Sequence, residues 1–84
     1  MQAIDGYMLT IHDLFAVSDG ALSGADADVA ILDAGVEIDR VLFSGMCSSA
    51  EGYCRRYAGR PGLTAELVSG PGRISFEAVK ANTI

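Results

Sequence analysis

The chain has 84 residues, 50% of them hydrophobic, and a formal net charge of −5. This length allows one domain, residues 1–84, with a single core, and this composition excludes general disorder. No apolar run approaches the roughly 20 residues that a membrane-spanning helix needs, and the N-terminus lacks the basic and apolar segments of a secretory signal. We therefore expect a cytoplasmic domain without a membrane contact.

The first predicted element is a strand over residues 7–17, because apolar side chains recur at every second position from Tyr7 to Ile11. The alternation is lost beyond Ile11, so we expect a bend near His12–Asp13. Residues 18–28 are acidic and contain glycine, a composition that is typical of a loop.

Two interpretations fit the segment that follows. Val29–Leu32 and Val36–Phe43 can pair as a β-hairpin through a turn at Asp33-Ala34-Gly35. Alternatively, a capping-box pattern could start a helix over residues 24–34 that ends at the same glycine. The β-branched side chains of the segment favour the hairpin. Within its second strand the apolar positions change phase, so we expect a bulge or bend near Asp39–Arg40.

A helix is predicted over residues 48–59. Ser48 and Glu51 form a capping box, and an apolar stripe at helical spacing ends with Tyr57. Arginines occupy the last turn, where cations suit the helix dipole, and Gly59 can end the helix.

Two further strands are predicted at Leu63–Val68 and at residues 73–78, where side chains alternate between two faces. Ser69-Gly70-Pro71-Gly72 has the composition of a turn, so we expect a C-terminal β-hairpin. Together the elements predict an α+β domain, in which a mostly antiparallel sheet of about five strands is covered on one face by the helix over residues 48–59.

Charge is divided unevenly along the chain. Residues 1–39 hold eight carboxylates and no Lys or Arg, whereas residues 40–84 hold all six basic residues and three acids. The first part therefore carries −8 and the second +3, an asymmetry that bears on partners and association rates. We expect an acidic surface that binds a basic protein partner; the candidate residues are Asp19, Asp26, Asp28, Asp33, Glu37 and Asp39. The alternative is that these acids only keep the protein soluble.

Other chemistry finds little support. His12 is the only histidine and no nucleophile-elbow pattern occurs, so no catalytic residue is predicted. Neither a zinc-type cluster nor an EF-hand pattern is present, so neither a metal nor a cofactor is predicted. The spacing of Cys47 and Cys54 favours two reduced, buried thiols. Arg55 and Arg56 lie near tyrosines, but the negative net charge opposes direct nucleic-acid binding.

In kind, the chain resembles small acidic inhibitors of phages and mobile elements, such as anti-CRISPR and anti-restriction proteins, which share no sequence signature. The resemblance rests on size, acidity and the lack of a catalytic motif. It implies a stoichiometric inhibitor that acts as a nucleic-acid mimic on a basic site of a partner complex. The alternative is a structural or assembly subunit, for example a homodimer. An enzyme is least favoured, because so short a chain rarely forms a concave site alone.

Overall fold

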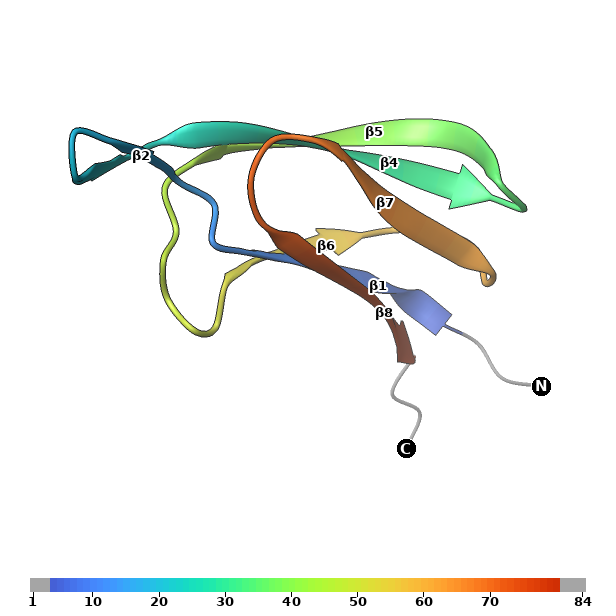
Figure 1. Ribbon diagram of the computed structural model, residues 1–84. Helices are drawn as coiled ribbons and strands as arrows, with labels where there is room; N and C mark the ends of the chain where they lie inside the picture. The colour runs from blue at the N-terminus through green and yellow to red at the C-terminus, as the bar shows by residue number, and fades with distance from the viewer. Residues whose placement is uncertain (1–3, 81–84) are drawn as a thin grey trace.

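The computed structural model describes residues 4–80, which form two layers of β-strands (Figure 1). The strands are β1 (Ile4–His12), β2 (Ala16–Ser18), β3 (Ala21–Ser23), β4 (Ala25–Asp33), β5 (Val36–Gly45), β6 (Tyr53–Tyr57), β7 (Leu63–Ser69) and β8 (Arg73–Lys80). One antiparallel sheet has the order β6-β1-β8 and the other the order β5-β4-β7, while β2 and β3 form a separate hairpin. No helix in the described part of the chain has the length and apolar character to cross a membrane.

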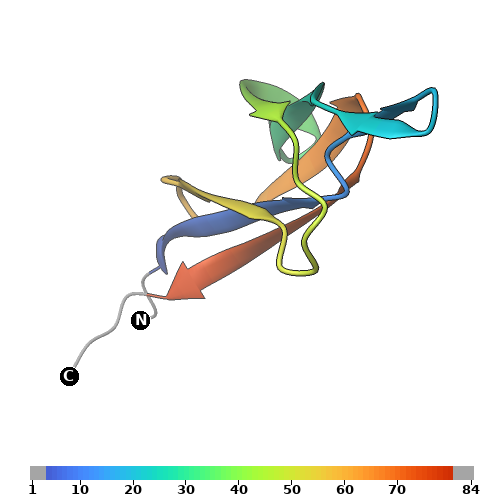
Figure 2. The ribbon, with the colours of Figure 1, turned by 90° about the vertical axis from the view of Figure 1, so that its left-hand side faces the viewer.

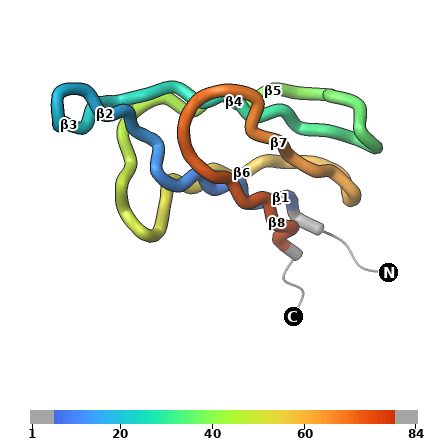
Figure 3. Tube along the Cα trace, viewed as in Figure 1, coloured from blue at the N-terminus to red at the C-terminus, as the bar shows by residue number. Residues whose placement is uncertain are grey.

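The expected α+β class is wrong, because residues 4–80 contain strands and no helix. Within the segment expected to be helical, residues 48–52 belong to the irregular connection 46–52, the yellow-green loop at the left of Figure 3, and Tyr53–Tyr57 is strand β6. Gly52 has a φ of 78°, which interrupts a right-handed helix. A Cβ at Gly52 would lie 2.8 Å from the carbonyl oxygen of Ile11, so this glycine lets the connection pass close to β1.

The hairpin interpretation of the segment after residue 28 is confirmed. Strands β4 and β5 pair through a two-residue turn in which Ala34 has a φ of 52°. Strand β5 has a bulge at Ile38, which has no pairing partner on β4. On either side of it, Asp39 pairs with Ile31 and Glu37 pairs with Leu32. The bulge therefore lies next to its expected position. Residues 18–28 were expected to be a loop, but they contain β3 and the start of β4.

The expected C-terminal β-hairpin is wrong in its pairing. Both strands form, but β7 pairs with β4 in one sheet and β8 pairs with β1 in the other. The turn between them therefore crosses from one layer to the other, as Figure 2 shows for the orange and red segments. Gly70, with a φ of 96°, lies so close to β4 that an added Cβ would clash with the carbonyl oxygen of Asp26.

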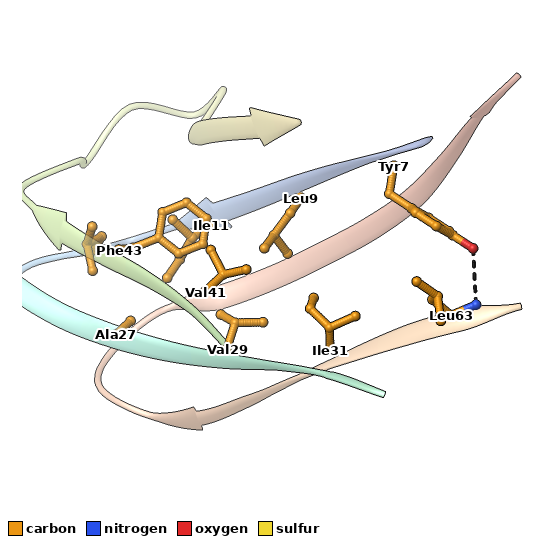
Figure 4. Packing of buried hydrophobic residues seen from close by; sticks show 10 residues of the cluster. Tyr7, Leu9, Ile11, Ala27, Val29, Ile31, Val41, Phe43 and Leu63 are labelled. Carbon is orange, nitrogen blue, oxygen red and sulfur yellow. Dashed lines mark hydrogen bonds between the residues drawn. The ribbon is translucent and has the colours of Figure 1, made fainter. Parts of the chain in front are cut away.

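The core lies between the two sheets (Figure 4). Its buried apolar side chains are Tyr7, Leu9, Ile11, Leu14, Ala27, Val29, Ile31, Val41, Phe43 and Leu63. The central strands β1 and β4 contribute most of them, so each sheet covers the apolar face of the other. Tyr7 also joins the layers through its hydroxyl group, which donates a hydrogen bond to the carbonyl oxygen of Arg60 (2.6 Å) and accepts one from the amide of Leu63 (3.0 Å).

We expect Gly70→Ala to destabilise the fold by about 1–3 kcal/mol more than Gly35→Ala. Both glycines have positive φ, so both substitutions strain the backbone, but a Cβ at Gly35 would meet nothing within 4 Å. Urea unfolding followed by circular dichroism measures the difference. Equal losses in the two variants would show that the approach of the crossing turn to β4 adds no constraint.

Candidate functional site

The outer surface of the β5-β4-β7 sheet gathers four carboxylates, which we call the acidic face: Asp26, Asp28, Glu37 and Glu66. Side chains alternate along a strand, so the inward positions of Ala27 and Val29 place Asp26 and Asp28 outward. Register places Glu37 opposite Leu32 and Glu66 opposite Ala30, both on the same side. The sequences of these strands contain one basic residue, Arg40. Four carboxylates and one guanidinium give the face a formal charge of −3.

Arg40 organises one end of the acidic face. Its Nε and Nη2 atoms donate hydrogen bonds to the two carboxylate oxygens of Glu37, at 3.0 and 2.9 Å. Its Nη1 lies 3.8 Å from Oδ2 of Asp28. The bidentate bond lowers the pKa of Glu37, and the same bond raises the pKa of Arg40. The pairing with Arg40 therefore favours the ionised form of Glu37 at this end of the face.

Hydroxyl groups orient the two aspartates of β4. The hydroxyl of Ser44 donates to Oδ1 of Asp26 at 2.6 Å, and the hydroxyl of Ser69 donates to Oδ2 of Asp28 at 3.4 Å. The two serines lie on β5 and β7, one on each side of β4. These bonds hold the carboxylates in place while leaving other lone pairs able to accept bonds from a partner.

The structure brings together only some of the six predicted binding residues. Asp26, Asp28 and Glu37 share the acidic face. Asp19 lies in the turn between β2 and β3, and Asp33, at the end of β4, forms an ion pair with Arg60. Asp39 lies on the inner side of β5, since it pairs in register with the core residue Ile31. The sequence-based set is therefore divided among different surfaces.

Glu66 belongs to the acidic face but was not predicted as a binding residue. Alternation along β7 places it outward, opposite the inward Ala65 and Leu67. That alternation is visible in the sequence. The missing information was the pairing of β7 with β4, which brings Glu66 beside the aspartates.

Folding also brings cations from the second part of the chain to acids of the first part. Besides the pair formed by Arg60, the Nε atom of Arg73 lies 3.3 Å from Oδ2 of Asp13. Exposed pairs of this kind add little stability. They do reduce the field of residues 1–39, so the acidic face and the β2–β3 turn hold much of the negative charge that remains.

Side chains of β6 form contacts with β5, so that the edge strands of the two sheets are bridged. The hydroxyl of Tyr57 donates to Oδ2 of Asp39 at 2.8 Å, and Nη1 of Arg55 donates to the carbonyl oxygen of Leu42 at 3.1 Å. The guanidinium of Arg55 also lies 4.9 Å from the centre of the Phe43 ring. The arginine thus satisfies an edge carbonyl of β5, which protects that edge from pairing with another strand.

The side chains that could support catalysis or metal binding do not come together in the described part of the chain. His12 is half-buried on β1, and no group of three or more His, Cys, Asp or Glu side chains in the described range has the geometry of a metal site. A cavity of about 70 Å³ beside Tyr57 and Arg56 is far smaller than the roughly 300–1,000 Å³ of small-molecule sites. Cys47 and Cys54 are free, as predicted, but neither is buried as expected: Cys47 is half-buried and Cys54 is exposed.

We expect Tyr57→Phe to raise the pKa of Asp39 towards its usual value. The hydrogen bond from Tyr57 is the main cause of the lowered pKa, with a smaller effect from the backbone amide of Arg40. Because the folded pKa lies below the unfolded one, this bond stabilises the fold above the unfolded pKa, and the stabilisation is lost as the pH falls through the folded pKa. NMR titration of the carboxyl carbons measures the shift. Glu37 is the internal control, and an unchanged midpoint for Asp39 would contradict the assignment.

Comparisons with protein-family models, curated proteins and solved structures found no match to this chain. The geometry of its own residues is therefore the basis for a functional conclusion, and the acidic face is the most developed feature of that geometry.

Proposed function

We propose that the chain is a non-catalytic protein-binding module that docks its acidic face onto a basic surface of a partner protein. The observation that carries this proposal is the concentration of four carboxylates and a single guanidinium on one exposed sheet surface. A sheet presents such groups on a rigid scaffold, so binding requires little ordering of the backbone.

Docking of this kind acts through charge and occupancy. Complementary charge speeds encounter at low salt and loses that advantage as salt rises. Asp26 and Asp28 are two positions apart on β4, so their Cα atoms are about 7 Å apart along the strand. Such a row of carboxylates suits a basic site that otherwise holds nucleic-acid phosphates. In that case the module acts as a stoichiometric inhibitor and nucleic-acid mimic.

We place this action in the cytoplasm. The support is the state of Cys47 and Cys54, which are unpaired, with Cys54 exposed to solvent. Free thiols persist in reducing compartments and are oxidised more readily outside them.

A second candidate function, an assembly subunit, is favoured by the amount of exposed apolar surface. The large exposed apolar side chains are Val17, Leu22, Val36, Ile38, Leu42, Met46, Tyr53 and Val68. Contact with a second copy would cover some of them.

The test of the acidic face uses two variants with equal charge. Asp26→Asn with Glu66→Gln removes two negative charges from the acidic face and changes the net charge of the chain from −5 to −3. Glu51→Gln with Glu77→Gln makes the same change in net charge at positions outside the face. The probe is an immobilised basic peptide of alternating serine and lysine. We expect the face variant to associate about tenfold more slowly than the wild type at low salt, because local charge steers encounter.

The control variant should keep most of the wild-type association rate. An equal loss in both variants would mean that net charge alone governs binding and would contradict a specific face. Insensitivity of the wild-type rate to salt would contradict the electrostatic mechanism. Capture from a bacterial lysate with the same three proteins then identifies the natural partner.

A further inference from the structure

The β2–β3 hairpin is a feature that the acidic face does not explain. It projects from the end of the two-layer structure, as both ribbon views show (Figures 1 and 2). Its strands pair in the register Val17 with Leu22, and they are joined at Asp19-Gly20, where Asp19 has a φ of 53°. A two-residue turn of this kind is favoured in tight hairpins, so the local sequence encodes the projection directly.

The apolar pair of the hairpin is not packed against the rest of the chain. Val17 is 64% exposed and Leu22 is 48% exposed, and neither belongs to the core cluster. A two-stranded hairpin without further packing is only marginally stable in water. Contact with a partner would both bury this pair and order the hairpin.

The hairpin also lacks the protection that β5 has. The edge of β5 carries the bulge at Ile38, and the guanidinium of Arg55 satisfies one of its carbonyl groups. By contrast, the sequences Ala16–Ser18 and Ala21–Ser23 contain neither a charged residue nor proline, and their register is unbroken. Charges, proline and bulges are the usual means of blocking an edge, so the hairpin is open to contact.

The surroundings of the hairpin indicate the charge of its partner. Only Gly24 separates β3 from β4, so the hairpin continues into the strand that carries the first carboxylates of the acidic face. Asp19 lies at its tip and Asp26 near its base, so negative charge flanks the apolar pair on both sides. The complementary surface is an apolar recess with a basic rim.

A second copy of the chain fits this surface poorly. Pairing two hairpins would bring equal negative charges together at their tips and bases. Eight residues also offer much less area than the roughly 800 Å² per partner of a stable interface.

We propose that the β2–β3 hairpin is a docking arm that places Val17 and Leu22 in an apolar recess with a basic rim on the partner protein, beside the surface bound by the acidic face. The inference rests on the proposed function and adds the apolar half of the recognition. It gives the partner a chemical description: a basic protein surface interrupted by an apolar recess.

The experiment compares two peptides of equal length and charge, one of alternating leucine and lysine and one of alternating serine and lysine. We expect the wild type to bind the leucine peptide about tenfold more tightly, because two apolar side chains become buried. Val17→Ser with Leu22→Ser should abolish this preference while leaving binding to the serine peptide unchanged. Hydrogen exchange should show that the leucine peptide protects the hairpin amides of the wild type.

The matched control is Val36→Ser with Ile38→Ser, whose side chains are 65% and 47% exposed. Both residues lie near the β4–β5 turn, at the end of the β5-β4-β7 sheet remote from the hairpin. This variant should keep the preference for the leucine peptide. Retention of the preference in the hairpin variant, or an equal loss in the control, would overturn the docking arm. A wild-type dimer in sedimentation that the hairpin variant abolishes would overturn it in favour of a second copy.

The two proposals can fail separately. If binding to the serine peptide depends on Asp26 and Glu66 while the hairpin variant behaves as the wild type, only the docking arm fails. If binding to the serine peptide is unaffected by Asp26→Asn with Glu66→Gln, the acidic face fails.

Discussion

Packing between β1 and β4, the central strand of each sheet, is the constraint on which the rest of the structure depends. No helix covers either sheet in residues 4–80, so the space between the layers is the place where apolar side chains leave water. Leu9 and Ile11 on one strand meet Val29 and Ile31 on the other. Because the inner faces of the two sheets pack against each other, the outward side chains of β4 can be charged. The β2–β3 hairpin, which precedes β4, can project from the sheets.

Alternation in the sequence predicted several strands correctly, because it depends on neighbours along the chain. The helix over residues 48–59 was wrong for the same reason: Ser48 and Glu51 are a local signal, whereas β6 forms by pairing with β1, about 45 residues earlier. Tyr53 and Tyr57 fit a period of two as well as a helical stripe. Long-range pairing decides between such periods, and the same limitation assigned β7 and β8 to one hairpin.

The candidate site was predictable to a similar extent. The charge split drew attention to Asp26 and Asp28, but the sequence analysis placed both in a loop, and their common outward side follows only from strand β4. The bulge at Ile38 separates Glu37 from Asp39 and sends them to opposite sides of β5, although they are two positions apart. Glu66 joins the aspartates only through strand register. Residue type and spacing therefore identified the acids, while tertiary pairing determined which of them share a surface.

The pairing of β1 with β8 has a consequence for the order in which the chain becomes structured during synthesis. The hairpin of β4 and β5 is local and can form early, but the sheet around β1 stays incomplete until residues 73–80 have emerged. Residues 1–39 contain no basic side chain, so before the arginines from Arg40 onward are synthesised, the repulsion among their carboxylates opposes collapse and aggregation of the nascent segment. Arg60 and Arg73, which pair with two of these acids, are synthesised close to β7 and β8, the last strands to join the sheets. Charge repulsion therefore keeps the nascent segment soluble early in translation, and burial of the apolar side chains does so once these strands have formed.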